Sequence, residues 1–376
     1  MKIFLDHNST TPILPLAFDS MKPYFTDLFY NPGGIQTICQ DINSEIEKSR
    51  DILESLISHK KGRLIFTSSA TEANNFIISQ NYFTEILTTG IEHPSIIESS
   101  ILYHKNEVIF LSLKSDGLIE LENLESNLRT LSNSNRRILV SIQYANQVIH
   151  TIQPIESISK LCRKYGAYLH VDATQAFGKI PLIDYDIDFI TVSAHKCYGP
   201  KGIAGLWISD DFDFNLLTPI LAGGHQEFNK RAGTHNVAGI IGFRTAAEYM
   251  CTHYEEHRVK IETMSKRFYK GFVEQVSDCV LNGNLTNRLP GGFHFSVPGA
   301  DMRSILISLP DLIISTGMAC SSSESDPVLK ALGKMDSTRN SFRMQIGFEN
   351  TEQEMDTAVE LLSNAIIKSR SFWGNI

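Results

Sequence analysis

The chain has 376 residues, of which 42% are hydrophobic and 20% are charged, and its net charge is −8. This composition is typical of a globular protein with a sizeable core. The length allows two domains, or one large domain with an appended lobe. The negative charge argues against direct binding to a nucleic-acid backbone. No apolar run reaches the ~18 residues that a membrane-spanning helix needs, so we also expect no membrane binding.

The six cysteines, at positions 39, 162, 197, 251, 279 and 320, show no CxxC spacing. This pattern argues against a zinc site or a disulfide framework and favours a reducing compartment. Residues 1–6 lack the apolar core of a signal peptide. We therefore expect a cytoplasmic protein that holds no metal.

The first 60 residues predict loops and helices. A polar, turn-forming run at 7–12 precedes a short helix at 14–21, and the Asn-Pro-Gly-Gly run at 31–34 is a loop. From position 41 onward, apolar residues recur with helical spacing and charges lie between them.

A strand at 63–67 is followed by small residues and then by a helical pattern. The backbone N–H groups at such a helix start, with the hydroxyl of Thr71, would suit a phosphate group. Simple capping of the helix by a serine or threonine would explain the same residues. The sequence leaves both interpretations open.

Throughout residues 60–210, short apolar strands alternate with helices. The strands are predicted at 85–89, 108–113, 138–143, 167–171, 189–192 and 204–208. Helices are predicted to begin at Pro94 and to span 154–165, where Gly166 ends the second one. Alternation of this kind indicates a mainly parallel, doubly wound sheet.

Chemically active side chains follow two of these strands. Asp172 comes after the strand at 167–171, and Ser193, His195 and Lys196 come after the strand at 189–192. In open α/β sheets, the site lies at the carboxyl ends of the strands. A lysine amine can form an imine with an aldehyde, a hydroxyl and an imidazole suit a phosphate, and a carboxylate keeps a pyridine nitrogen protonated. Pyridoxal phosphate combines these groups.

Each of these residues also has a plain structural explanation. Lys196 could be a solvated surface lysine, and Asp172 could simply cap the following turn. The occurrence of both at adjacent strand ends favours the cofactor.

The C-terminal part predicts a second lobe. A long helical stretch reaches about residue 276 and passes into this lobe near residues 250–265. An alternating pattern at 292–297 predicts an antiparallel strand, and a last strand at 341–347 and a helix at 352–368 follow. We expect a large domain of residues 13–255 and a small domain of residues 1–12 and 256–376.

Cys320 stands just before a polar run at 321–326 that has nothing to bury and is expected to be mobile.

Taken together, these segments resemble the cysteine desulfurases, which are fold-type I pyridoxal-phosphate enzymes of the class-V aminotransferase group. The matching positions run nearly end to end, at 5–12, 66–75, 92–93, 170–175, 193–202, 231–234, 319–320 and Arg343. The resemblance implies an α/β fold: a large domain with a mainly parallel seven-stranded sheet, and a smaller α+β C-terminal domain. It also implies a homodimer that removes sulfur from L-cysteine, giving L-alanine and a Cys320 persulfide for transfer to a protein acceptor.

The resemblance further implies a role for each site residue. Lys196 would bind pyridoxal phosphate as an imine and shuttle protons, and His93 would stack on the cofactor ring. Cys320 would attack the substrate sulfur: a thiolate is a strong nucleophile, and a mobile segment would let one sulfur visit the site and then an acceptor. The alternatives are that Cys320 is a buried, inert cysteine, or that Cys197, beside Lys196, is the nucleophile. Asp172 would pair with the pyridine nitrogen and Gln175 with the phenolic oxygen. The other implied cofactor contacts are Ala70, Thr71, Gln147, Ser193, His195 and, from a partner subunit, Thr234. The implied substrate contacts are Asn8, Gln147 and Arg343, whose planar fork suits a carboxylate.

The sequence departs from the family pattern at several positions. Gln147 replaces an Asn near the cofactor, and His150 replaces a Gly. Ser69, His225 and Asn229 also stand where glycines are usual. Because the core residues are retained, two alternatives stay open beside the desulfurase: a selenocysteine lyase, and a degenerate pyridoxal-phosphate-binding paralogue with weak or no activity. Iron–sulfur cluster assembly and tRNA thiolation both stay open as the pathway that receives the sulfur, and so does the identity of the acceptor.

Overall fold

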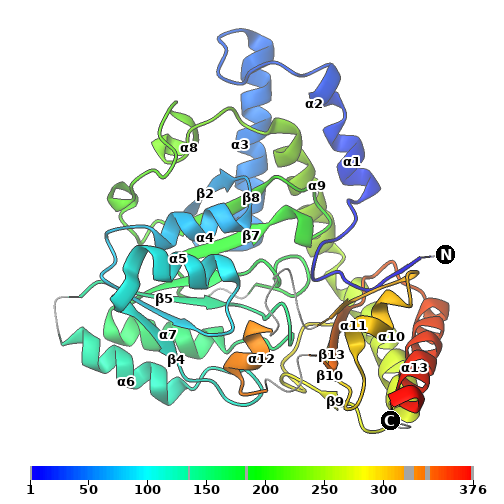
Figure 1. The fold of residues 1–376 in the computed structure, drawn as a ribbon. Helices are drawn as coiled ribbons and strands as arrows, with labels where there is room; N and C mark the ends of the chain where they lie inside the picture. Colours follow the sequence, from blue (N-terminus) through cyan, green and yellow to red (C-terminus); the bar gives the residue numbers. More distant parts are fainter. Residues whose placement is uncertain (1, 134–135, 183–184, 317–325, 335–338, 374–376) are drawn as a thin grey trace.

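The computed structural model describes residues 2–133, 136–182, 185–316, 326–334 and 339–373. A large α/β body carries a central sheet, and a smaller α+β body packs beside its edge (Figure 1). Both the N-terminal strand and the C-terminal helix belong to the smaller body (Figure 1). The predicted α/β class is confirmed.

The central sheet has seven strands in the order β2-β8-β7-β6-β5-β3-β4. Only β8 runs antiparallel to its neighbours, so six strands share one direction. This confirms a mainly parallel seven-stranded sheet. The strand bounds are β2 Gly62–Thr67, β3 Glu85–Thr89, β4 Val108–Leu111, β5 Ile138–Gln143, β6 Tyr168–Asp172, β7 Phe189–Ser193 and β8 Ala204–Ser209.

Helices cover both faces of this sheet because successive strand residues point to opposite sides. In β2, for example, Leu64 and Phe66 join the core on one face, while Ile65 joins the core on the other. Four helices pack on the first face: α3 Thr37–Ile57, α6 Leu121–Ser132, α7 Ile155–Tyr165 and α9 Val237–Thr252. The second face packs against α4 Ala70–Ile78 and α5 Pro94–His104.

The predicted elements match the observed ones closely, with a few shifted bounds. Helix α3 begins at Thr37, four residues before the predicted start. The predicted long helical stretch is two helices, α9 and α10 Tyr254–Gln275, with His253 between them. Gly166 ends α7 in the left-handed conformation, with a φ of 68°, as a glycine C-cap does. The remaining short elements are α1 Pro15–Met21, α2 Pro23–Thr26, α8 Gln226–Asn229, η1 Lys105–Glu107, η2 Ala194–Lys196 and η3 Phe214–Leu216.

The smaller body is built on a four-stranded antiparallel sheet in the order β12-β13-β10-β9. Phe293, Phe295 and Phe342 project from one face of it into a core with α10 and α13. Ile3 and Leu5 of the N-terminal segment join this same core, and β1 pairs with β11. The bounds are β1 Ile3–Phe4, β9 Val280–Leu281, β10 Gly292–Ser296, α11 Met302–Ile307, β11 Leu312–Ile313, β12 Ser315–Thr316, α12 Pro327–Ala331, β13 Ser341–Gln345 and α13 Glu352–Trp373.

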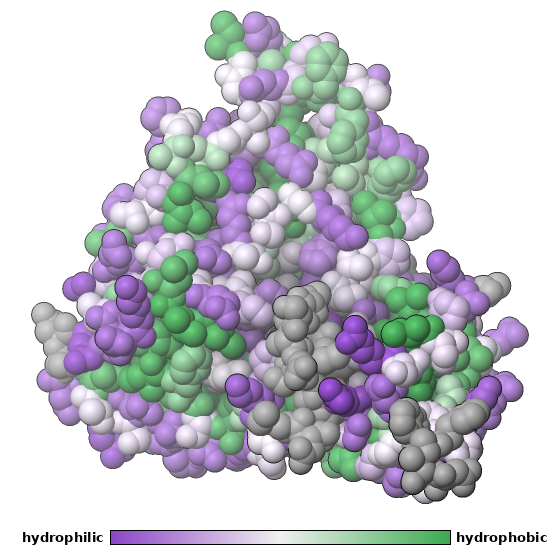
Figure 2. All heavy atoms as spheres, viewed as in Figure 1, coloured by the Kyte–Doolittle hydropathy of each residue, from purple (hydrophilic) through white to green (hydrophobic). Residues whose placement is uncertain are grey.

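The surface is mixed in polarity. Figure 2 shows apolar side chains mixed with polar ones on the end of the molecule that carries α1, α2 and the start of α3. Phe25, Phe29 and Ile35 in this region are all more than half exposed, and Ile35 reaches 91%. Among the described residues, no helix combines the length and apolarity that a bilayer crossing needs.

Candidate active site

The carboxyl ends of the parallel strands border a cavity of about 320 Å³. Gln143 ends β5 and Asp172 ends β6, and both line this cavity. Ten of the predicted site residues line it as well: Asn8, Ala70, Thr71, His93, Gln147, Asp172, Gln175, His195, Lys196 and Arg343. Chain segments separated by more than 300 residues therefore meet at one point.

Three predicted residues are placed differently. Ser193 is buried at the end of β7 and does not border the cavity. Thr234 is exposed to solvent and also does not border it. Cys320 lies outside the described residues, so its predicted role stays a prediction.

Lys196 is held at the cavity by the N-terminal segment. It ends the short helix η2, and its Nζ donates to the backbone oxygens of Asn8, at 2.5 Å, and Ser9, at 2.7 Å. A solvated surface lysine would have no such partners. The interpretation of Lys196 as a surface lysine is therefore wrong.

Asp172 is only 6% exposed, and its carboxylate is fixed on both oxygens. Oδ1 accepts from the Thr174 backbone N–H and Oδ2 from the Asn74 amide, each at 2.9 Å. The first bond caps the turn after β6, while the same side chain lines the cavity. Capping and cavity lining are thus compatible roles of one carboxylate. Asp172 is the last residue of β6, whereas the sequence placed it just beyond the strand.

The start of α4 confirms that a serine caps this helix, while phosphate binding there stays a prediction. Ser69 is the N-cap, and its side-chain oxygen accepts from the Glu72 backbone N–H at 3.2 Å. The Thr71 side chain is exposed at the cavity instead. Ser69 supplies the cap, so the first N–H groups of α4 and the Thr71 hydroxyl face a space suited to an anion.

Two histidines border the cavity in neutral form. His93 caps α5, and its Nδ1 accepts from the Ser95 backbone N–H at 3.1 Å, which places the ring proton on Nε2. The loss of solvation in the surrounding protein lowers the pKa of His93. The negative charge of Asp172 raises this pKa, and the positive charges of Lys196 and Arg343 lower it further. Burial and nearby lysines lower the pKa of His195 to about 4.

A hydrogen-bonded path connects Asp172 to His93. The Asn74 amide donates both to Asp172 and to the Ser95 hydroxyl oxygen, at 2.9 Å each. Ser95 Oγ in turn lies 2.8 Å from His93 Nδ1. Sequence reasoning assigned no role to Asn74 or Ser95. The only available signal was that Asn74 belongs to the segment at 66–75.

Arg343 enters the cavity from the smaller body. It stands on β13 and is 5% exposed, and its Nη1 donates to the Gln147 backbone oxygen at 3.4 Å. Asn8 Nδ2 donates to the same oxygen at 2.8 Å. The main chain of Gln147 therefore joins the two other predicted substrate contacts, Asn8 and Arg343, and Gln147 itself borders the cavity.

His150 occupies the position of a family glycine in the conformation that a glycine would adopt. Its φ is 63°, it is fully buried, and neither ring nitrogen has a partner among the described residues. The ring packs against Gly292, where a Cβ atom would lie 2.4 Å from His150 Cγ. The lack of a side chain at position 292 thus accommodates His150. Burial lowers the pKa of His150 far below its usual value.

The cavity suits a polar occupant. Asn8 Oδ1, Gln143 Oε1, Thr174 Oγ1 and Arg343 Nε are buried and have no partner in the described part of the chain. Buried polar atoms are normally hydrogen-bonded. The lining supplies an amine, a buried carboxylate and a helix N-terminus with an adjacent imidazole. These groups match the aldehyde, the pyridine nitrogen and the phosphate of pyridoxal phosphate.

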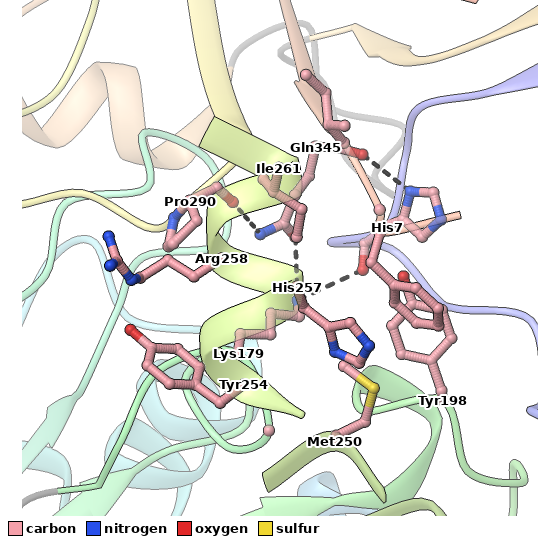
Figure 3. A pocket seen from close by; sticks show the side chains of 14 residues that line it. His7, Lys179, Tyr198, Met250, Tyr254, His257, Arg258, Ile261, Pro290 and Gln345 are labelled. Carbon is pink, nitrogen blue, oxygen red and sulfur yellow. Dashed lines mark hydrogen bonds between the residues drawn. The ribbon is translucent and has the colours of Figure 1, made fainter. Parts of the chain in front are cut away.

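A second, smaller cavity lies nearby and offers about 30 Å³ (Figure 3). Lys179, His7 and Gln345 border it together with residues of α10. Sequence reasoning missed Lys179, although its position four residues after Gln175 could have prompted attention. No group of acidic, histidine or cysteine side chains that could hold a metal occurs within the described ranges.

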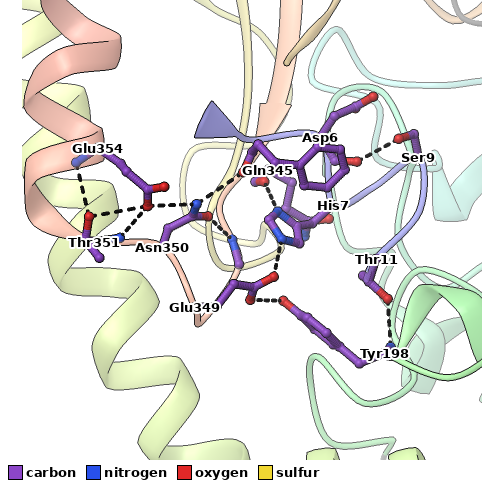
Figure 4. Close-up of polar contacts among 12 residues, drawn as sticks. Asp6, His7, Ser9, Thr11, Tyr198, Gln345, Glu349, Asn350, Thr351 and Glu354 are labelled. Atoms are coloured by element: carbon purple, nitrogen blue, oxygen red, sulfur yellow. Dashed lines mark hydrogen bonds and ion pairs between the residues drawn. The ribbon is translucent and has the colours of Figure 1, made fainter. Parts of the chain in front are cut away.

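A polar network ties the N-terminal segment, the Lys196 loop and the chain after β13 together (Figure 4). His7 Nε2 and the Tyr198 hydroxyl each lie 2.7 Å from an oxygen of Glu349. Gly347 makes this approach possible, because a Cβ atom there would lie 2.4 Å from His7 Nε2. The network fixes the segment that presents Asn8 and Ser9 to Lys196.

Comparison with known proteins agrees with this geometry. The family model described as Aminotransferase class-V matches residues 3–357. A protein of Dictyoglomus turgidum named cysteine desulfurase IscS is 34% identical, over 98% of this chain and 96% of its own. A cysteine desulfurase of Nostoc sp. is 33% identical, over 98% of this chain and 94% of its own.

Solved structures lead to the same group. A NifS-like protein from Rickettsia africae superposes with a TM-score of 0.88 at 30% identity, covering 97% of this chain and 99% of that one. A structure described as SspA in complex with cysteine has a TM-score of 0.80 at 25% identity, covering 93% of this chain and 100% of its own. The chain therefore belongs to the class-V aminotransferase family, as a pyridoxal-phosphate-dependent enzyme related over its whole length to the cysteine desulfurases.

Proposed function

We propose that this protein is a cysteine desulfurase that removes sulfur from L-cysteine, releases L-alanine and passes the sulfur to a protein acceptor. One observation carries the proposal: Lys196 and Asp172 from two adjacent strand ends, and Arg343 from the distant smaller body, border a single cavity. An amine, an ion-pairing carboxylate and a guanidinium at one point suit an amino-acid substrate on pyridoxal phosphate. The full-length relatives named cysteine desulfurase specify the reaction.

The cofactor would be held by residues of the large body. Lys196 would bind its aldehyde, Asp172 its pyridine nitrogen and Gln175 its phenolic oxygen, while His93 would lie against the ring. The phosphate contacts would be Ala70, Thr71 and His195, which all border the cavity, whereas the predicted contact Ser193 does not. When bound, pyridoxal phosphate supplies an electron sink for bond breaking next to the amino group.

The substrate would be oriented by Arg343, Asn8 and Gln147. A guanidinium binds a carboxylate through two parallel hydrogen bonds, and Arg343 Nε is a buried donor with no partner among the described residues. Asn8 Oδ1 is likewise buried without a partner there. Both groups are supported by the Gln147 backbone oxygen, so they are oriented in advance of substrate binding.

Lys196 Nζ would move protons at the substrate carbons, and Cys320 would take the sulfur. The Cys320 thiolate attacks the substrate sulfur, an S–S bond forms as the C–S bond breaks, and the carbon takes up a proton. Cys197 is poorly suited to this role. It is fully buried, and burial raises the pKa of its thiol well above the usual range.

The test is to incubate the purified protein with L-cysteine and measure alanine and sulfide. Cys320→Ser should retain the cofactor absorbance yet give little alanine, and mass spectrometry of the wild-type protein should find the added sulfur on the peptide that holds Cys320. Cys279→Ser, at a partly exposed cysteine, is the matched control and should stay active. Turnover of selenocysteine alone would indicate a selenocysteine lyase, and cofactor binding without turnover of either substrate would indicate a degenerate paralogue.

The proposed working unit is a homodimer. Two observations support it: Thr234 is exposed and outside the cavity of its own chain, and the α1–α2 end of the molecule exposes apolar side chains (Figure 2). Several exposed apolar side chains in one region are consistent with an interface. Light scattering on the cofactor-loaded protein should give twice the chain mass of 42.2 kDa. A monomer that retains its cofactor would contradict the homodimer.

We further propose the division into a large domain of residues 13–255 and a small domain of residues 1–12 and 256–376. Its support is that the core of α10, α13 and the small sheet includes Ile3 and Leu5 but no residue of the central sheet. A cytoplasmic location is proposed as well. The five described cysteines are all unpaired, which suits a reducing compartment.

A further inference from the structure

Lys179 reaches the space between the two bodies from a tight turn after Gln175. Gly178 makes the turn, with a φ of 74°. A Cβ atom at this position would also lie 2.8 Å from the Cβ of Cys197. A glycine is therefore needed there, and its presence directs the next side chain into the small cavity of Figure 3.

The Lys179 ammonium has three oxygen acceptors from three parts of the chain. Its Nζ lies 3.1 Å from Gln175 Oε1, 3.0 Å from Gln345 Oε1 and 3.5 Å from the His7 backbone oxygen. Burial and the positive charge of Lys196 lower the pKa of Lys179 to about 7, against the effect of Asp6. Holding an amine in such a place is costly unless its hydrogen bonds are satisfied.

Lys179 Nζ donates to the Gln175 amide, and this decides the orientation of that amide, because its oxygen can accept a hydrogen bond and its NH₂ group cannot. Because Oε1 of Gln175 faces Lys179, its NH₂ group must face the other way. One hydrogen of that group bonds the Asn8 backbone oxygen at 2.8 Å. Asn8 O is also the acceptor for Lys196 Nζ. Gln175 itself borders the large cavity, so its NH₂ group is the end available there.

The same amine reaches the strand that carries the predicted substrate arginine. Gln345 and Arg343 are two residues apart on β13 and therefore project from the same face of the sheet. The Gln345 amide is fixed like that of Gln175, with Oε1 toward Lys179 and Nε2 toward the Pro290 backbone oxygen at 3.4 Å. Lys179 thus connects Gln175, a predicted cofactor contact of the large body, to β13 of the smaller body, which carries the predicted substrate contact Arg343.

We infer that Lys179 is a positioning residue: by donating to Gln175 and Gln345 at once, it presents the Gln175 NH₂ group to the phenolic oxygen of pyridoxal phosphate. This inference rests on the proposed function and adds to it a residue that touches neither cofactor nor substrate. Without Lys179, the Gln175 amide is free to turn its carbonyl oxygen toward the cavity. Two buried carbonyl oxygens then also lack a donor.

The experiment measures cofactor affinity of the full-length holoenzyme, from its visible absorbance during dilution, in a double-mutant cycle. Lys179→Met should raise the dissociation constant for pyridoxal phosphate about tenfold. This is the smallest change expected from the loss of a hydrogen bond to a charged group. In a Gln175→Ala background the same substitution should change it less than about twofold, because the two residues act through one contact. Lys334→Met is the matched control: it removes another partly buried amine that donates to an amide, Asn282 Oδ1 at 3.0 Å.

Gln175→Glu is the second variant, and it serves if Lys179→Met does not fold. It keeps an acceptor for Lys179 but has no N–H to offer, so the dissociation constant should again rise about tenfold or more. Three results would overturn the inference. The first is that Lys179→Met and Gln175→Ala change the dissociation constant additively, and the second is that Lys334→Met changes it as much as Lys179→Met does. The third is that Gln175→Glu binds the cofactor with wild-type affinity. A wild-type protein that binds no cofactor would instead refute the proposed function, so the two failures are distinct.

Discussion

His170 offers the sharpest test of how burial sets the acid sensitivity of this fold. It stands in the middle of β6 and is fully buried. Its Nδ1 lies 2.9 Å from the Ser141 hydroxyl and its Nε2 lies 3.0 Å from the Thr191 hydroxyl, so two neighbouring strands hold the ring. Burial lowers the pKa of His170 from 6.5 to about 4, against the opposing effect of Asp172.

A histidine whose pKa is lower in the folded state destabilises that state once the unfolded chain begins to bind a proton. The contribution vanishes well above pH 6.5, grows as the pH falls and is complete well below pH 4. A difference of about 2.5 pKa units corresponds to about 3 kcal/mol at the acid end, and to about 2 kcal/mol at pH 5. His170→Gln, which does not titrate, should therefore lose about 2 kcal/mol less stability than the wild type between about pH 7.5 and about pH 5.

The assay is urea unfolding of the wild type and of His170→Gln at the two pH values. The variant is expected to be less stable at the higher pH, because it alters the buried contacts, but the prediction concerns only the change with pH. His59→Gln, at an exposed histidine, should leave that change as in the wild type. If His170→Gln loses as much stability on acidification as the wild type does, the assignment of a lowered pKa to His170 is wrong.

Three further substitutions test separate parts of the structure. Glu227→Gln should cost about 3 kcal/mol in urea unfolding, the lower end for breaking a buried ion pair. The buried Arg50 loses the charged partner that it binds through two hydrogen bonds of 2.8 and 2.9 Å and keeps only the more exposed Glu47. Gly347→Ala should cost about 1–3 kcal/mol and lower the melting temperature, because the new Cβ atom would press on His7; an unchanged melting temperature would show that the network yields freely. Arg343→Lys should raise KM for cysteine about tenfold or more, since a lysine does not form the paired contact to a carboxylate, whereas an unchanged KM would exclude Arg343 as the carboxylate contact.

Much of the large body could be predicted from the sequence because its signals are local. Strand periodicity and the helix stops fixed the α/β alternation, and the bounds of β3 and β5 were predicted to the residue. The meeting of Asp172 with Lys196 was also predictable. The carboxyl ends of adjacent parallel strands share one edge of a sheet, so closeness follows from strand order alone.

The tertiary structure decided the contacts between segments that no local rule connects. The partners of Lys179 lie at positions 7, 175 and 345, and only the packing of the small body on the large one brings them to a single amine. The same holds for the fit of His150 against Gly292. Hydrogen bonds and steric fit act over a few ångströms, whereas sequence periodicity reports only whether a residue faces a core. The sequence therefore determined which chemistry the chain carries, and the tertiary structure determined which side chains orient it.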